Sequence, residues 1–306
     1  MSPLNRLRQA LVPSAGTRAT PSSIDVTTMQ VGDQSLRVAV KQGTAARPPL
    51  LLFNGIGANL ELAFPFLEAL TDTTAIIFDV PGVGGSEMPR LPYRPSTIAR
   101  LGARLVEQLG YSQIDVAGVS WGGGMAQQFA HQYPKMCRKL VLLATAPGMT
   151  MVPASLPVLW KMATPRRYVD KTYMREIAPD IYGGAFRKDP KLIQKHAQAM
   201  RGTRGFGYFF QLLAMAGWSS LPWLWSIRQP TLILAGRDDP LVRPINARIL
   251  SIMMPNARLE MVDDGHLFIV TRPGETAGAI EAFLSGLTAT TEPDCAGSGP
   301  LNFNPT

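Results

Sequence analysis

The chain has 306 residues, of which 46% are hydrophobic, and its formal net charge is +8. This length and apolar content suffice for one sizeable globular domain with an inserted subdomain. No run reaches the roughly 20 apolar residues of a transmembrane helix, and the N-terminus lacks the continuous apolar segment of a secretory signal. The two cysteines, Cys137 and Cys295, suggest neither a disulfide framework nor a metal-ligand cluster. We therefore expect a cytoplasmic protein without a cofactor or a metal.

The predicted elements begin with a hairpin, after a lead-in over residues 1–23 that we expect to be loosely ordered. Two alternating runs, Ile24–Gln30 and Ser35–Lys41, predict its antiparallel strands. Six short, predominantly apolar runs follow, as in a parallel sheet covered on both faces: Leu50–Phe53, Ala75–Phe78, Ile114–Val119, Leu140–Ala144, Thr231–Ala235 and Leu259–Val262. Helical patterns lie between them: Pro95–Gly110, Trp121–Tyr133, Arg243–Met254 and Thr276–Leu287. This alternation predicts an α/β fold with a mostly parallel sheet and helices on both faces.

One long segment, residues 146–227, interrupts the alternation of strand and helix. It has no convincing strand, it contains four of the five tryptophans, and it has helical stretches such as Asp189–Arg201 and Tyr208–Gly217. We predict that it forms a helical cap, or lid, over a core made of residues 24–145 and 228–287. The tail, residues 288–306, is rich in Thr, Gly, Pro and Asn, and we expect it to be disordered.

The positive charge is concentrated in this predicted cap. Between Met151 and Ser226 there are 11 Lys or Arg residues and 4 Asp or Glu residues, an excess of seven positive charges. Either this excess forms a solvated helical surface, or it forms a face that meets anionic lipid or protein around an insoluble substrate. No nucleic-acid-binding motif accompanies the charge, so we expect no nucleic-acid partner.

A G-x-S-x-G motif, Gly118-Val119-Ser120-Trp121-Gly122, lies between a predicted strand and a predicted helix. This is the setting that the motif requires in order to present a nucleophilic serine. The chain must turn sharply there, and side chains at the two glycine positions would clash. The N-terminus of the following helix also directs its dipole toward the reacting centre. We therefore predict that Ser120 is a nucleophile.

A serine hydroxyl needs a base that removes its proton, and the chain has only three histidines. His131 lies within a predicted helix, and we interpret it as structural. His196 lies among lysines on a predicted cap helix, and we expect it at the surface. His266 follows the last predicted strand, in a loop at the carboxyl end of the sheet, where the base is expected. We predict that His266 is the base.

The third member of the site should be a carboxylate that orients His266. Asp238 and Asp239 both follow the predicted strand Thr231–Ala235, and the order Ser, Asp, His is that of the α/β-hydrolase fold. The two aspartates compete for the role, and we favour Asp239. Asp263 and Asp264 are closer to His266 in sequence, but roles within their own loop suit them better.

Hydrolysis through a serine also needs two N–H donors that hold the oxyanion. We predict that Trp121, the residue after the nucleophile, supplies one through its backbone. The second should come from the backbone of Ile56, in the Asn54–Gly57 loop that follows a predicted strand. The glycine-rich stretch Asp79–Ser86 lacks the lysine of a phosphate-binding loop, so we interpret it as a structural turn.

Five stretches of the sequence carry a resemblance to a known family: Phe53–Leu62, Asp79–Ser86, Gly118–Gly124, Pro179–Phe186 and Asp263–Phe268. On these stretches the chain, from about Ile24 to about Leu284, resembles the intracellular depolymerases of medium-chain-length poly(3-hydroxyalkanoate). The resemblance implies an α/β-hydrolase fold with the catalytic set Ser120, Asp239 and His266. It also implies a polyester substrate on bacterial storage granules, cleaved to 3-hydroxy acids or oligomers through an acyl-enzyme.

The predicted cap would then face an apolar polymer. We expect Trp160, Trp218 and Trp223 to line a slot for alkyl side chains, although tryptophans at helical spacing are often ordinary core. Of the two interpretations of the basic cap, contact with anionic lipid or protein would then take place at the granule surface. Two other functions stay open: a general carboxylesterase, lipase or C–C bond hydrolase of the same fold, and a granule-associated or ligand-binding protein without turnover.

Overall fold

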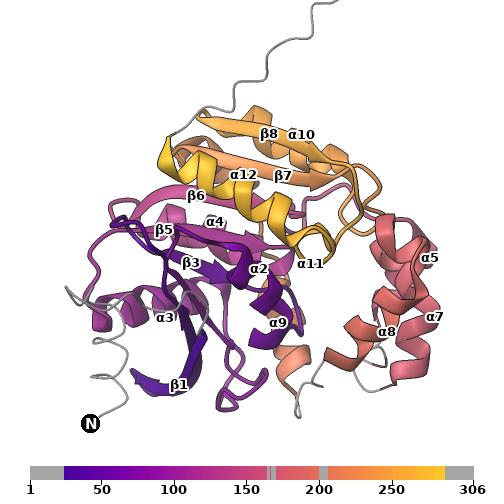
Figure 1. The fold of residues 1–306 in the computed structure, drawn as a ribbon, viewed down its shortest axis with the longest axis horizontal. Helices are drawn as coiled ribbons and strands as arrows, with labels where there is room; N and C mark the ends of the chain where they lie inside the picture. Colours follow the sequence, from indigo (N-terminus) through magenta and orange to yellow (C-terminus); the bar gives the residue numbers. More distant parts are fainter. Residues whose placement is uncertain (1–23, 164–165, 167–169, 200–205, 287–306) are drawn as a thin grey trace, which may run out of the picture.

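The computed structural model describes residues 24–163, 166, 170–199 and 206–286 (Figure 1). The predicted lead-in and the predicted tail lie outside the described residues. The centre of the molecule is an eight-stranded sheet in the order β1-β2-β4-β3-β5-β6-β7-β8. Its strands are β1 Ile24–Val31, β2 Gln34–Lys41, β3 Leu50–Phe53, β4 Ala75–Phe78, β5 Ile114–Val119, β6 Cys137–Leu143, β7 Thr231–Gly236 and β8 Ala257–Val262.

The sheet is mostly parallel. Strand β2 pairs antiparallel with both β1 and β4, and every other neighbouring pair of strands is parallel. This confirms the predicted α/β class. The largest difference from a predicted strand boundary is at β6, which begins three residues before the apolar run. Its polar residue Arg138 pairs there with the buried carboxylate of Asp115 on β5.

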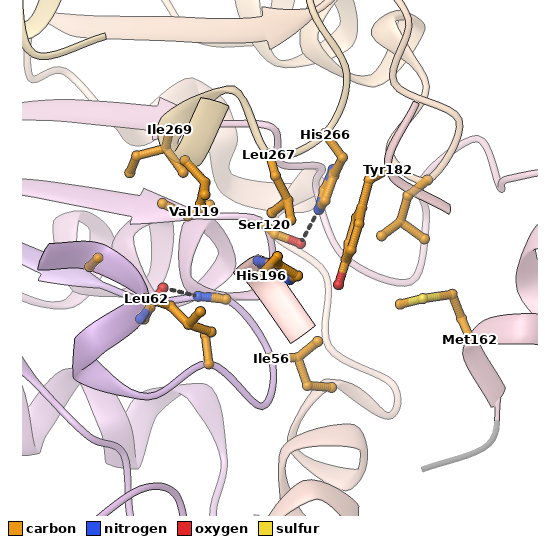
Figure 2. A pocket seen from close by; sticks show the side chains of 16 residues that line it. Ile56, Leu62, Val119, Ser120, Met162, Tyr182, His196, His266, Leu267 and Ile269 are labelled. Carbon is orange, nitrogen blue, oxygen red and sulfur yellow. Dashed lines mark hydrogen bonds between the residues drawn. The ribbon is translucent and has the colours of Figure 1, made fainter. Parts of the chain in front are cut away.

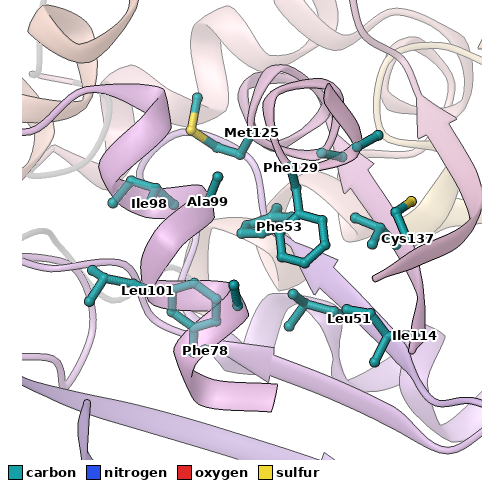
Figure 3. Close-up of a cluster of buried hydrophobic side chains, with 14 of the residues drawn as sticks. Leu51, Phe53, Phe78, Ile98, Ala99, Leu101, Ile114, Met125, Phe129 and Cys137 are labelled. Atoms are coloured by element: carbon teal, nitrogen blue, oxygen red, sulfur yellow. The ribbon is translucent and has the colours of Figure 1, made fainter. Parts of the chain in front are cut away.

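Helices cover both faces of the sheet (Figure 1). They are α2 Phe64–Ala69, α3 Pro95–Gln108, α4 Trp121–Gln132, α10 Pro244–Met253, α11 Phe268–Thr271 and α12 Pro273–Ser285. Alternate residues of a strand point to opposite faces, so Phe53 and Leu51 join one buried cluster and Leu52 joins the other. Phe53 lies between Phe78 and Phe129, with ring centroids 5.8 and 6.1 Å away (Figure 3). Burial on both faces explains why β3 and β4 are apolar throughout.

The described residues between β6 and β7 form helices and no strand. The helices are α5 Leu156–Ala163, α7 Lys171–Tyr182, η2 Gly184–Arg187, α8 Pro190–Ala199, α9 Gly207–Met215 and η3 Leu221–Ser226. Apolar side chains of α5, α7, η2 and α8 form a separate cluster around Ile177, Ile181 and Phe186. In contrast, Ala214 of α9 and Leu224 of η3 belong to the main core. We use the name cap for α5, α7, η2 and α8, which lie together at the right of Figure 1.

A buried carboxylate organises the turn after β4. Asp79 accepts hydrogen bonds from the amides of Leu60 and Gly85, each at 2.9 Å, and lies 3.5 Å from Arg37. Burial raises the pKa of Asp79 to about 6, although these donors act to lower it. Leu60 begins the short helix η1, Leu60–Ala63, which follows the loop after β3. Asp79 therefore holds together two loops at the carboxyl end of the sheet, which agrees with a structural role for the glycine-rich stretch.

Glu61 of η1 joins the same network through an ion pair with Arg37, at 2.8 Å between Nη2 and Oε1. Burial alone would raise the pKa of Glu61, but hydrogen bonds from Arg37 and Asn59 outweigh it and lower the pKa to about 2. A carboxylate whose pKa is lowered in the folded protein stabilises the fold at pH values above its ordinary pKa, which is 4.5 for Glu61. That stabilisation is lost as the pH falls from 4.5 toward 2.

We therefore expect Glu61→Gln to lower the free energy of unfolding at pH 7, because the amide loses the charge that pairs with Arg37. The difference from the wild type should shrink as the pH falls below 4.5, where the wild-type carboxylate begins to lose its advantage. Denaturant unfolding of both proteins at a series of pH values measures this. A difference that stays constant down to the acid limit of the folded protein would contradict the interpretation.

Candidate active site

The proposed nucleophile lies in a strained turn between β5 and α4. Ser120 has φ 54° and ψ −117°, a region that non-glycine residues rarely adopt. A Cβ atom on Gly118 would lie 2.2 Å from the carbonyl oxygen of Gly122, and one on Gly122 would lie 2.1 Å from that of Phe53. Both glycines are therefore required by the close approach of backbone to backbone.

The structure brings the three predicted catalytic side chains together. Ser120 Oγ lies 3.0 Å from Nε2 of His266 (Figure 2), and Nδ1 of His266 lies 2.7 Å from Oδ2 of Asp239. His266 and Asp239 are only 2% and 4% exposed. The other oxygen of Asp239 accepts the amides of Leu241 and Val242 at 2.9 and 2.8 Å, which fixes the carboxylate. The hydrogen-bonded series is complete from hydroxyl to carboxylate.

The neighbouring aspartate has a different partner. Oδ2 of Asp238 accepts the amide of Gly184 at 2.8 Å and pairs with Arg187, so Asp238 binds η2 of the cap. Burial alone would raise the pKa of Asp238, but the hydrogen bonds from Gly184 and Arg187 lower it. Asp264 also binds η2, because its Oδ1 accepts the amide of Ala185 at 2.8 Å. The two aspartates thus have different partners. Asp238 contacts the cap, and Asp239 contacts His266.

The cap also contacts the histidine directly. The amide of His266 donates to the carbonyl oxygen of Tyr182, the last residue of α7, at 2.7 Å. The two rings lie nearly parallel, with an interplanar angle of 4° and centroids 6.4 Å apart. The loop that carries His266 is therefore held by a residue of the cap.

Backbone donors lie close to the serine. Trp121 is the first residue of α4, where an amide has no acceptor within its own helix. On the other side, Ile56 lines the pocket around Ser120, and a Cβ atom on Gly55 would lie 3.9 Å from Cβ of Ser120. The loop after β3 therefore lies against the nucleophile, as the predicted pair of donors requires.

Gln211 of α9 connects both of these donor segments. Its carbonyl oxygen accepts the indole N–H of Trp121 at 2.9 Å, and its side-chain oxygen accepts the amide of Gly57 at 2.8 Å. Gln211 is only 1% exposed. This residue was missed by the sequence analysis, because nothing in its local pattern on an apolar helix points to two partners so distant in sequence.

A pocket surrounds Ser120, with about 640 Å³ of empty space when the open solvent at its mouth is included. Most of its lining is apolar (Figure 2). The lining residues are Asn54, Gly55, Ile56, Ala58, Leu62, Ala63, Val119, Ser120, Met162, Tyr182, His196, Leu241, His266, Leu267, Ile269 and Val270. They come from the core and from α5, α7 and α8 of the cap.

The three tryptophans predicted to line this pocket lie elsewhere. Trp160 is 82% exposed on α5. Trp218 donates to Gln128 of α4 at 2.9 Å, and Trp223 stacks on His131 of the same helix with centroids 4.3 Å apart. The prediction was wrong for Trp218 and Trp223 because the chain after α9 packs against α4 rather than over the serine. His131 is structural, as predicted.

The prediction for His196 was also wrong. This side chain is 6% exposed and lines the pocket, in contact with the rings of Tyr182 and Phe186, each with its centroid 5.4 Å away. A usable signal was present in the sequence. His196 follows the apolar Ile193 by three residues, which places both side chains on one face of a helix, and Ile193 is buried in the cap cluster.

Two other kinds of site were sought in the described part of the chain. Among those residues, no group of three His, Cys, Asp or Glu side chains is arranged as ligands for a metal ion. Within the same ranges, no helix combines the length and the apolar character needed to cross a bilayer. The residues that gather around Ser120 are therefore the candidate site that the structure presents.

Comparison with known proteins agrees with this geometry. The family described as alpha/beta hydrolase fold matches residues 48–273. A poly(3-hydroxyalkanoate) depolymerase from Ectopseudomonas oleovorans is 55% identical over 258 residues, which cover 84% of this chain and 91% of the relative.

Several solved structures are similar to this chain at the level of the fold. An esterase from Exiguobacterium antarcticum has a TM-score of 0.74 at 19% identity, and the match covers 85% of this chain and 99% of the esterase. A hydrolase from Pseudomonas aeruginosa has a TM-score of 0.72 at 23% identity, and the match covers 85% of this chain and 98% of the hydrolase. Taken with the family match and the 55% identity, the chain belongs to the α/β hydrolase fold family, and within it to the poly(3-hydroxyalkanoate) depolymerases.

Proposed function

We propose that the chain hydrolyses ester bonds of medium-chain-length poly(3-hydroxyalkanoate), with Ser120 as nucleophile, His266 as base and Asp239 as the orienting carboxylate. The observation that carries this proposal is the hydrogen-bonded series from Ser120 Oγ through the His266 ring to Asp239, at 3.0 and 2.7 Å. A serine becomes nucleophilic when an oriented base removes its proton. The series provides both the base and its orientation.

In the first half of the reaction, Nε2 of His266 takes the proton of Ser120, and Oγ attacks the ester carbonyl carbon. The carbonyl oxygen becomes an oxyanion, which accepts hydrogen bonds from the backbone amides of Trp121 and Ile56. Asp239 stabilises the imidazolium that forms. His266 then gives its proton to the departing hydroxyl oxygen of the polymer, and the acyl group stays on Ser120.

In the second half, water replaces the polymer hydroxyl. His266 removes a proton from water, which attacks the acyl-enzyme and releases a 3-hydroxy acid or an oligomer. Ser120 recovers its proton from His266. The apolar lining of the pocket supports these steps, since hydrogen bonds to a developing charge are stronger where little water surrounds them.

Two observations support this choice of substrate. The 55% identical relative from Ectopseudomonas oleovorans is a poly(3-hydroxyalkanoate) depolymerase. The pocket has apolar walls at Leu62, Met162 and Leu241, which suit alkyl side chains longer than methyl.

The site of action proposed here is the surface of a storage granule in the cytoplasm. Trp160 of α5 lies with Leu156, Pro157 and Leu159 in a shallow apolar groove on the outside of the cap. The segment Met151–Ser226 carries an excess of seven positive charges. An apolar groove in a segment with excess positive charge suits contact with a granule coated by anionic lipid or protein.

The two aspartates provide a matched pair of variants. We expect Asp239→Asn to lower kcat for p-nitrophenyl octanoate by about 10⁴-fold, because the amide favours the wrong tautomer of His266. Asp238→Asn, which changes a residue that binds η2, should reduce kcat far less. Steady-state kinetics of both purified variants decide the assignment, and a larger loss in the Asp238 variant would reverse it.

The substrate is tested with the polymer itself. We expect the wild type to release 3-hydroxy acids from poly(3-hydroxyoctanoate) but not from poly(3-hydroxybutyrate), and Ser120→Ala to release none while it keeps the wild-type circular dichroism spectrum. Cleavage of small esters without any release from either polymer would instead indicate a general carboxylesterase. Substantial polymer hydrolysis by Ser120→Ala would remove the serine from the mechanism.

Granule contact is tested by its dependence on salt. The Debye screening length falls from about 10 Å at 0.1 M ionic strength to about 3 Å at 1 M. We expect the fraction of Ser120→Ala protein that sediments with poly(3-hydroxyoctanoate) granules to fall as NaCl is raised over this range. Binding that is insensitive to NaCl would contradict an electrostatic contribution of the cap.

A further inference from the structure

Among the residues that the structure describes, few polar side chains line the pocket beyond those of the proposed triad. Ser120 and His266 belong to the triad, and Asn54 stabilises its own loop, with Nδ2 donating to the Asn59 carbonyl at 3.1 Å and Oδ1 accepting the Gly55 amide at 2.9 Å. The others are Tyr182 and His196. Both belong to the cap, so a polar atom of a bound acyl chain would meet the cap rather than the core.

The ring of His196 is held in place by its aromatic neighbours. Tyr182 and Phe186 contact it edge to face, with interplanar angles of 83° and 84°. Its helix α8 contacts η1, which carries the pocket residue Leu62. Figure 2 shows His196 among the side chains that surround Ser120. The imidazole is therefore fixed in the wall of the same pocket in which the ester is cleaved.

The substrate class differs from ordinary fatty esters at one atom close to the carbonyl. Each repeat of poly(3-hydroxyalkanoate) has an oxygen on C3, two bonds from the carbonyl carbon, as an ester oxygen within the chain or as a hydroxyl at its end. An unsubstituted alkanoate has only hydrogen there. A neutral imidazole can donate a hydrogen bond to either oxygen, and it can also accept one from the hydroxyl.

We propose that His196 hydrogen-bonds the C3 oxygen of the acyl unit bound at Ser120, and that it thereby selects 3-oxygenated acyl chains over plain ones. This inference rests on the proposed function, because it assigns to His196 the recognition of the acyl unit that Ser120 attacks. A site that hydrogen-bonds a substrate oxygen discriminates against an analogue that lacks this oxygen.

The test compares methyl 3-hydroxyoctanoate with methyl octanoate, using wild type, His196→Phe and His196→Gln. Phenylalanine keeps the aromatic contacts with Tyr182 and Phe186 but has no polar atom, whereas glutamine keeps a hydrogen-bonding group. We expect His196→Phe to lose about tenfold in kcat/KM for the 3-hydroxy ester, equivalent to about 1.4 kcal/mol. Its kcat/KM for methyl octanoate should fall by a smaller factor, because that ester has no C3 oxygen. His196→Gln should recover part of the preference.

A histidine outside the pocket serves as the matched control. His131→Phe should leave both kcat/KM values unchanged, because His131 stacks on Trp223 and binds Ser226, and none of the three lines the pocket. An equal loss on both esters in His196→Phe, or a wild type that does not prefer the 3-hydroxy ester, would overturn the inference. No turnover of either ester by the wild type would instead overturn the proposed function itself.

Discussion

The structure depends on one strained residue, Ser120, at the turn from β5 into α4. Its positive φ is possible only because the backbone around it is tightly packed, with glycine at positions 118 and 122 where a Cβ atom would overlap a carbonyl oxygen. The parallel sheet and the helix are fixed in place by two buried clusters, and they impose the turn. The stability of the core is thus what offsets the local strain and keeps the hydroxyl exposed to the pocket.

The cap is joined to the reacting groups as well as covering them. The carbonyl oxygen of Tyr182 accepts the amide of His266, and the backbone amides of η2 donate hydrogen bonds to Asp238 and Asp264. These contacts lie on the two loops that carry Asp239 and His266. The acid–base pair and the wall of the pocket therefore form one connected unit, and the same short segment of the cap supports both. In this arrangement the identity of the cap residues bears on the chemistry as directly as that of the core.

Sequence reasoning succeeded where a residue's role follows from its immediate neighbours. The boundaries of β3, β4 and β5 agree with the predicted runs, since burial on both faces leaves a short apolar signature. Sequence reasoning failed where the role of a residue depends on which other part of the protein its segment packs against. His196 was assigned to the surface from its lysine neighbours, and Trp218 and Trp223 were assigned to the pocket from their segment. Trp218 and Trp223 pack against α4, much earlier in the chain, and His196 lines the pocket together with Ser120.

By itself the sequence determined the α/β class, because the class follows from the pattern of apolar residues. It also determined the strained G-x-S-x-G turn and the order Ser120, Asp239, His266 along the chain, because the turn follows from local steric limits. Only the tertiary structure showed that Asp239, and not Asp238, contacts His266, and only it brought His196, Gln211 and Tyr182 close to Ser120. The physical reason is that adjacent residues in a loop point in different directions. Which of them reaches the histidine depends on the packing of the cap, and that packing is a property of contacts between segments far apart in the chain.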